Sequence, residues 1–393
     1  MKLWYFTEQQ YHPGWDRVGG PIRNTPPTAL IDPDEAADLF DRYFEEYAVL
    51  DQLGINIAVN EHHASFQCMS PSPMVIVAAL ARTTSRVRLL SIGSPIAQRL
   101  DPVRLAEEMA LTDILSRGRT EVGLIKSIPW EHFNSNSNPM EVNGRFWEAH
   151  DLILKALTTR DGPFSWAGEY FHFRNVNIVP RPYQDPHPPI WMTGQSIASA
   201  ENIGRKGYVC VTSQSGFRDA SPFYASYRKA YEAAHGRPTP LDRLGYMGYM
   251  AVGRTEDEAG EIAQRIHKWV EFLGSQHPSF QYAAGFAPAA AYASGLRRGM
   301  GGVHFFLGHQ APSIHELREK GMMFWGTVDQ VYEQVRAFYK KVGGIGHLLM
   351  QMGGTATKED TLRCMDLVAN KLRPMLEGLA NEPVHAEPER LRA

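Results

Sequence analysis

Two adjacent histidines follow the apolar run Ile55–Val59, in the order Asn60-Glu61-His62-His63. A neutral imidazole at the end of a buried strand can accept or donate a proton near neutral pH. The alternative is a structural histidine that is hydrogen-bonded to a neighbouring carboxylate, and the sequence leaves both interpretations open. No metal site is predicted, because adjacent side chains point in different directions and the chain has no HExxH motif.

A second candidate site is the turn Gly194-Gln195-Ser196, which follows a predicted strand and precedes a helix predicted over Ile197–Arg205. The first backbone N–H groups of a helix have no partner inside the helix, and the Ser196 hydroxyl adds a further donor beside them. Such a turn binds anions, and a phosphate is the natural one. We expect Gln195 and Ser199 to add hydrogen bonds.

The same residues, Gly-Gln-Ser-Ile-Ala, also match a degenerate nucleophile elbow, in which Ser196 would attack an acyl carbon. A serine hydrolase would then need His347 and either Asp219 or Asp329 to complete a triad. The sequence has no HGGG-like segment upstream that would supply an oxyanion hole. We therefore favour the phosphate site and keep the hydrolase as an alternative.

Strand-like and helix-like runs alternate along the chain and must position these residues. Strands are predicted at Leu3–Phe6, Ile55–Val59, Arg88–Ile92, Glu121–Ile125, Pro189–Met192, Tyr208–Val211, Tyr246–Val252 and His347–Met352. Helices are predicted at Pro33–Leu53, Pro73–Thr83, Pro102–Leu115, Asn143–Leu157, Ile197–Arg205, Pro222–Ala234, Thr255–Leu273, Val328–Val342 and Thr357–Leu376.

Eight strand–helix repeats predict an α/β protein with a (β/α)8 TIM barrel, and a doubly wound open sheet is the alternative. Neither GxGxxG nor GxxxxGK[ST] occurs, which weakens the dinucleotide-binding and P-loop interpretations. We expect one barrel domain over residues 1–380, with insertions in the βα loops at 9–31, 162–187 and 274–325. The second insertion is predicted to contain a short pair of strands, and the polar tail 381–393 is predicted to be disordered.

Composition excludes several classes of partner and site. The chain has 40 Lys and Arg against 43 Asp and Glu, so its formal net charge of −3 does not predict nucleic-acid binding. The longest clean apolar run, Met74–Ala81, is too short to span a membrane, and the N-terminus has no signal-peptide pattern. The three widely spaced cysteines form no CxxC motif, so we expect a cytoplasmic protein with reduced thiols.

Three segments resemble the bacterial luciferase-like flavin-dependent monooxygenases. They are INIAVNEHHAS at 55–65, DPVRLAEEMALTDILSRGR at 101–119, and Gly168–Ser199 with its ordered prolines. The resemblance extends from the first strand to about Leu376 and is weakest in the insertions 9–31 and 274–325.

The resemblance implies roles for particular residues. His62 matches the active-site histidine that assists the flavin's oxygen chemistry, whereas Glu61 and His63 would brace the strand end. Gly93 and Ser94, within Ser-Ile-Gly-Ser-Pro, match a position where the family has a bulge or an unusual peptide beneath the flavin. From the residues alone, an ordinary turn is the simpler interpretation there.

The turn after the fourth strand departs from the small-residue turn that is common in the family. It has Ile125, Lys126 and Ser127; Ile125 would make the flavin's reactive edge apolar, and Lys126 would either approach the flavin or point to solvent. Trp130, Glu131 and Phe133 would line the pocket or pack at its rim. The full set predicted to bind the cofactor is Gly93, Ser94, Ile125, Lys126, Gly194, Gln195, Ser196 and Ser199.

The resemblance also implies an activity. Reduced FMN from a separate flavin reductase would react with O2 to form a flavin C4a-(hydro)peroxide, which transfers one oxygen atom to a small organic substrate. A homodimer formed through the second and third helices is expected. An F420-dependent oxidoreductase on the same barrel remains an alternative.

Overall fold

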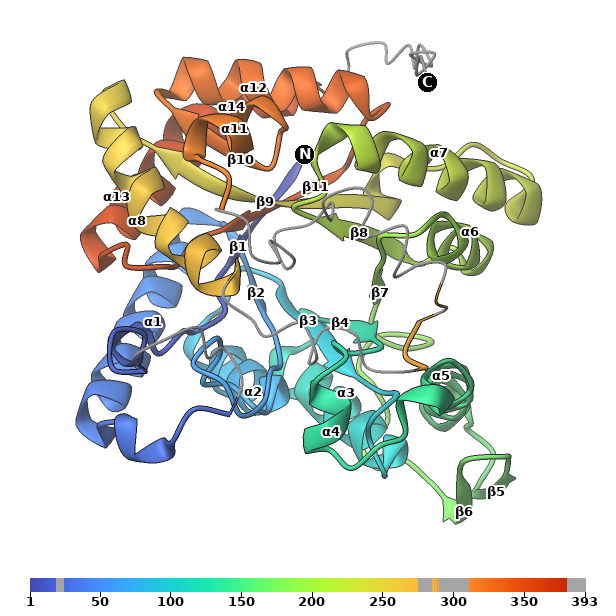
Figure 1. Cartoon of the computed structure of the whole chain (residues 1–393). Coiled ribbons are helices and arrows are strands. Elements are labelled where there is room, and N and C mark those ends of the chain that lie inside the picture. Colours follow the sequence, from blue (N-terminus) through green and yellow to red (C-terminus); the bar gives the residue numbers. More distant parts are fainter. Residues whose placement is uncertain (19–24, 275–284, 288, 290–310, 380–393) are drawn as a thin grey trace.

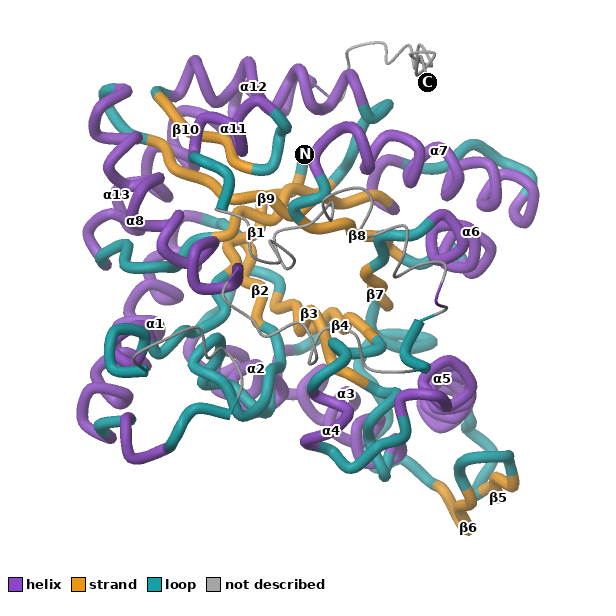
Figure 2. Tube along the Cα trace, viewed as in Figure 1, coloured by secondary structure: helices purple, strands orange, loops and turns teal. Residues whose placement is uncertain are grey.

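Eight parallel strands form a closed ring with helices around it (Figures 1 and 2). This computed structural model describes residues 1–18, 25–274, 285–287, 289 and 311–379. Around the ring the strands are β1 (Lys2–Phe6), β2 (Asn56–Val59), β3 (Leu89–Pro95), β4 (Thr120–Ile125), β7 (Ile190–Thr193), β8 (Val209–Ser213), β9 (Leu244–Val252) and β11 (His347–Gln351). β11 pairs with β1 and closes the ring, so the predicted (β/α)8 barrel is confirmed and the open sheet is wrong.

A ninth strand, β10 (Met323–Gly326), pairs with the second half of β9, and the first half of β9 pairs with β8 and β11. β10 and the short helix α11 (Ile314–Glu319) lie within the insertion predicted over 274–325. The last residues of that segment therefore belong to the fold, and the prediction of one long loop insertion was wrong there. Apart from 285–287 and 289, the rest of that insertion between 275 and 310 lies outside the described residues, as does the predicted tail.

The predicted helices are present, but the one predicted from Pro222 begins earlier, at Gly216, and the one predicted over Thr357–Leu376 is interrupted by a π-helical turn at Val368–Leu372. α1 illustrates the local rule: the Asp32 side chain accepts hydrogen bonds from two first-turn N–H groups, Pro33 occupies the first turn, and Gly54 ends the helix at a φ of 69°. The helices are α1 (Pro33–Leu53), α2 (Pro73–Thr83), α3 (Pro102–Ser116), α4 (Glu131–Asn134), α5 (Val142–Thr158), α6 (Ile197–Lys206), α7 (Gly216–His235), α8 (Glu256–Gly274), α12 (Val328–Lys341), α13 (Lys358–Leu367) and α14 (Arg373–Leu379).

The insertion at 162–187 contains the predicted pair of strands. β5 (Phe164–Ala167) and β6 (His172–Val176) form an antiparallel hairpin that projects from the barrel beside α5 (Figure 1). The Glu148 carboxylate of α5 holds it, because it accepts hydrogen bonds from the Trp166 indole and from three successive backbone N–H groups of the hairpin turn. This one side chain fixes the hairpin to the barrel's helical layer.

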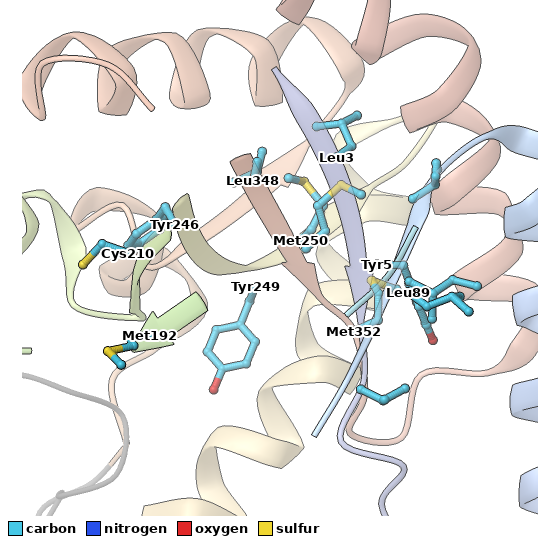
Figure 3. Close-up of a cluster of buried hydrophobic side chains, with 14 of the residues drawn as sticks. Leu3, Tyr5, Leu89, Met192, Cys210, Tyr246, Tyr249, Met250, Leu348 and Met352 are labelled. Carbon is cyan, nitrogen blue, oxygen red and sulfur yellow. The ribbon is translucent and has the colours of Figure 1, made fainter. Parts of the chain in front are cut away.

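Buried side chains fill both the barrel interior and the layer between strands and helices. Figure 3 shows part of the second group, where Leu3 on β1, Leu348 on β11 and Met250 on β9 lie together. Inside the barrel, the Trp4 indole donates to Nδ1 of His347 at 3.0 Å, and Nε2 of His347 donates to a backbone carbonyl. Burial lowers the pKa of His347 to about 3, so this histidine is a neutral structural residue.

None of the helices in the described ranges has both the length and the apolar character needed to cross a membrane.

The loop before β3 is held by the Asp51 carboxylate, which accepts from the backbone N–H groups of Ser85, Arg86 and Val87 at 2.8–3.1 Å. Burial raises the pKa of Asp51, but these hydrogen bonds outweigh burial and hold the pKa below its ordinary value.

We predict that Asp51→Asn lowers the free energy of unfolding at pH 7 by about 1–2 kcal/mol, because one accepting oxygen is lost. A group with a depressed folded-state pKa contributes fully above its unfolded pKa, and the contribution disappears as the pH falls through the folded value. The difference from the wild type, measured by urea unfolding, should therefore shrink below about pH 4. The exposed Asp38→Asn is the control; an equal effect there, or a difference that persists at acid pH, would contradict the prediction.

Candidate active site

The carboxyl ends of the barrel strands surround a cavity of about 750 Å³. This is the end of a TIM barrel where βα loops form active sites, and the volume is typical of small-molecule sites. Side chains from β1, β2, β3, β4, β7, β8 and β9, or from the loops after them, line it, together with α5 and α6. The lining includes Phe6, Glu8, Asn60, Glu61, His62, Ile92, Gly93, Leu124, Ile125, Lys126, Trp130, Phe146, Met192, Gly194, Gln195, Ser196, Ser199, Gln214 and Met247.

The structure brings nearly all of the predicted site residues together around this cavity. Of the nine, His62, Gly93, Ile125, Lys126, Gly194, Gln195, Ser196 and Ser199 line it. Ser94 is the exception: it is fully buried, and its hydroxyl lies 3.0 Å from that of Ser91 within β3. The placement of Ser94 therefore indicates a role in packing of the strand rather than contact with a ligand.

His62 is held by a buried carboxylate. Its Nδ1 lies 2.8 Å from Oε1 of Glu131 at the start of α4, and the Glu131 side chain is 1% exposed. A carboxylate accepts hydrogen bonds, so Nδ1 carries the proton and the neutral ring has its lone pair on Nε2. His62 is thus hydrogen-bonded to a carboxylate, as one interpretation of the sequence required. It also lines the cavity, which is where a role in proton transfer requires it to lie.

Glu131 is kept ionised by several donors. Its Oε1 also accepts from the backbone N–H of His63 at 3.1 Å, and its Oε2 accepts from the Ser127 hydroxyl. Burial raises the pKa of Glu131, but the electrostatic interaction with the imidazole of His62 and the hydrogen bonds from His62, Ser127 and His63 outweigh burial, so the pKa lies below its ordinary value. The sequence placed Glu131 near the pocket but gave no indication of its pairing with a residue 69 positions away.

The neighbours of His62 brace the end of β2, as the resemblance implied. Nε2 of His63 lies 3.0 Å from Oε1 of Glu61, and the other Glu61 oxygen accepts from Arg99 at 2.5 Å. Glu61 is therefore satisfied by two partners.

The junction of β3 and β4 forms a close-packed wall of the cavity. The peptide between Ile92 and Gly93 is cis, and the pairing with β4 shifts between Ile92 and Ser94, so the bulge that the resemblance implied is present. A Cβ atom on Gly93 would lie 2.5 Å from the side chain of Ile125, so a larger residue would displace Ile125 from its place beside Gly93. Ile125 and Leu124 make this wall apolar.

The turn after β7 opens α6 as predicted. Ser196 is the N-cap, and it forms a capping box with Ser199, each side chain bonding the other's backbone N–H at 3.1–3.2 Å. The backbone N–H groups of Ile197 and Ala198 lie in the first turn, where the helix offers them no carbonyl partner. Ser196 and Ser199 both line the cavity, so this helix end can receive an anion from it.

Lys126 reaches the cavity rather than pointing only to solvent. Its ammonium donates to the Asn143 side chain at 2.5 Å and lies 5.7 Å from the centre of the Phe146 ring. Burial lowers the pKa of Lys126. Both partners belong to α5, which packs beside α3 in the helical layer.

The arrangement does not support the hydrolase alternative. Ser196 bonds with Ser199, and within the described ranges no histidine lies within hydrogen-bonding distance of its hydroxyl. His347 is the first residue of β11 and is engaged by Trp4, whereas Ser196 follows the carboxyl end of β7. The proposed triad members are thus at opposite ends of the barrel.

Glu8, Gln214 and Met247 line the cavity but were not predicted as site residues. They follow, or lie within, β1, β8 and β9, and no short motif marks them. The position of Glu8 and Gln214 just after their strands could have indicated them, whereas Met247 lies in the first half of β9 and had no such signal.

The family model for luciferase-like monooxygenases matches residues 40–344. The chain belongs to the luciferase-like monooxygenase family.

A curated relative is the oxygenase component of the flavin-dependent trigonelline monooxygenase of Acinetobacter baylyi, which is 29% identical over 240 residues, or 60% of this chain. The chain spans 64–66% of the length of the first curated relatives it matches, slightly less than two thirds.

Two solved structures show the same fold. The oxygenating constituent of 3,6-diketocamphane monooxygenase from Pseudomonas putida, in complex with FMN, has a TM-score of 0.71 at 17% identity and covers 95% of this chain and 97% of its own. An F420-dependent secondary alcohol dehydrogenase has a TM-score of 0.66 at 16% identity and covers 94% and 98%. At these identities the likeness shows the barrel alone.

Proposed function

We propose that this protein is the oxygenase of a two-component monooxygenase, which uses reduced FMN and O2 to insert one oxygen atom into a small organic substrate. The observation that carries the proposal is that one cavity holds both a phosphate-type turn at the start of α6 and a histidine aligned by a buried carboxylate. The trigonelline relative is described as an oxygenase component, which supports a separate reductase as partner.

The residues present fit FMN. The cavity volume suits a mononucleotide, the α6 N-terminus suits its phosphate, and Lys126 adds a positive charge on the same cavity. Gly93 and Ile125 form a flat, apolar wall against which a ring system can lie. When bound, reduced FMN supplies the electrons for oxygen activation and the transfer of one oxygen atom.

The protein's own residues would control protons and water. Glu131 holds the His62 ring with its Nδ1 protonated, so that Nε2 can accept a proton and the resulting imidazolium is stabilised by the carboxylate. Apolar side chains around the ring site, among them Ile92, Leu124 and Trp130, exclude water from the reacting groups.

We predict that Ser196→Ala weakens FMN binding by about tenfold or more, because a donor to a charged phosphate is lost, and leaves riboflavin binding nearly unchanged. Fluorescence titration of both flavins measures this difference. Ser313→Ala is the matched control, because it removes the equivalent capping box of α11 away from the cavity. Equal weakening for the two flavins would contradict the phosphate site, and binding of F420 in place of FMN would favour the F420-dependent alternative.

We predict that His62→Ala retains FMN binding but reduces product formed per O2 consumed by about 100-fold or more, because a general acid–base group is removed. Glu131→Gln should give a smaller loss, because the histidine remains but is no longer aligned by a charge. Reduced FMN is supplied by a flavin reductase with NADH, and 18O2 incorporation into a panel of cyclic ketones, monoterpenes and N-methylpyridinium acids is measured. The exposed His172→Ala is the control, and unchanged turnover in His62→Ala would reject the assignment.

We also propose a homodimer through α2 and α3, which pack together and expose apolar side chains. Val75 is 65% exposed, and Leu100, Leu111 and Ile114 lie on or beside α3. We predict that Val75→Glu combined with Leu111→Glu converts a dimer into a monomer in sedimentation velocity. Val179→Glu, which adds the same charge to an exposed valine elsewhere, should leave the dimer intact; a monomeric wild type would contradict the proposal.

A further inference from the structure

Three buried polar side chains form a hydrogen-bonded row at the carboxyl ends of β8, β11 and β1. Nε2 of Gln214 donates to Oε1 of Gln351, and Nε2 of Gln351 donates to Oε1 of Glu8 at 3.3 Å. The three residues are only 4%, 1% and 6% exposed, and Gln214 and Glu8 line the cavity. The row therefore belongs to the cavity wall, on the part of the barrel ring that the predicted site residues do not use.

The acceptor on Glu8 sets the direction of the row. Oε1 of Glu8 accepts from the amide nitrogen of Gln351, so the carbonyl oxygen of Gln351 is turned towards Gln214. Gln214 must then turn its own nitrogen towards Gln351. The carbonyl oxygen of Gln214, Oε1, then lies on the side of its amide group that faces away from Gln351.

That oxygen is an acceptor without a donor. In the described part of the chain, no N–H or O–H donates to Oε1 of Gln214, and this atom is not one of the fully buried side-chain atoms without a partner, so it is open to the cavity that Gln214 lines. The backbone of Gln214 has a φ of 41°, and its N–H bonds to the carbonyl of Met247, so the residue is held in place. A ligand that fills the cavity would cover this acceptor, and covering it without supplying a donor is unfavourable, so a ligand with a donor at this point is favoured.

We propose that Gln214 is a specificity-determining residue that accepts a hydrogen bond from a hydroxyl or N–H group of the substrate, with Gln351 and Glu8 as positioning residues. The inference rests on the proposed function, because it concerns the same cavity. The flavin ring also has an N–H donor, but the residues proposed to hold the flavin belong to β3, β4 and β7. The row belongs to β8, β11 and β1, which carry none of those residues, and this leaves that side of the ring for the substrate.

The test compares probes that differ only in the donor: 2-naphthol with 2-methoxynaphthalene, and indole with 1-methylindole. FMN is first titrated into the full-length protein, and each probe is then titrated by calorimetry into the protein with and without FMN. We expect the donor-bearing probe of each pair to bind about five- to 100-fold more tightly, which corresponds to one buried hydrogen bond.

Gln214→Leu should abolish this preference without weakening the methylated probes or FMN. Glu8→Gln, which keeps the shape of the side chain, should reduce the difference in affinity within each probe pair. An amide at position 8 can also donate, so Gln351 and Gln214 can then exchange their donor and acceptor sides. Gln52→Leu, at an exposed position of α1, is the matched control and should keep the preference. Thermal unfolding of each variant verifies the fold, and Glu8→Gln still tests the proposal if Gln214→Leu does not fold.

Equal affinity within the wild-type pairs, or a preference that survives Gln214→Leu, would overturn the proposal. If Gln214→Leu loses affinity for FMN and the wild type shows no preference within the probe pairs, the acceptor belongs to the flavin, and this outcome would also overturn the proposal. Failure of the wild type to bind FMN, with the probe preference intact in the flavin-free protein, would reject the proposed function and leave the donor site standing.

Discussion

The Glu131 carboxylate is the interaction on which the candidate site depends. It joins the loop after β2, which supplies His62, to the segment after β4, which supplies Ser127 and Glu131 itself. β3 lies between these two strands, so the carboxylate joins segments that are not neighbours in the ring. One buried anion thus fixes the tautomer of a histidine and ties the loop after β2 to the segment after β4, and removal of the charge would weaken both at once.

The two ends of the cavity are built by different kinds of interaction. The start of α6 is assembled locally, since Ser196 and Ser199 bond each other three residues apart. The His62 end requires contacts between residues far apart in the sequence. A local motif can therefore form as soon as its helix forms, whereas the His62 end requires the closed barrel.

This difference explains how much could be predicted from the sequence. All eight ring strands, the hairpin at 162–187 and most helix starts were predicted, because period, proline and capping patterns are local. The start of α7 was placed six residues too late, at Pro222, because proline is also tolerated within the first turns of a helix. The turn at 194–196 was predicted for the same reason. The pairing of Glu131 with His62, and the row from Gln214 to Glu8, could not be predicted, because they depend on which strand ends become neighbours. Strand β10 was missed because four residues in a Gly- and aromatic-rich segment give too short a pattern.

The attachment of β10 has a consequence for how this barrel can diverge. The ring is closed by β8, β9 and β11, and β10 is added only where β9 extends beyond β8. Because no pairing within the ring passes through β10, a change in the number of residues before α11 leaves the register of the eight ring strands unaltered. Evolution can therefore vary the length of that stretch without changing the scaffold that supports the cavity.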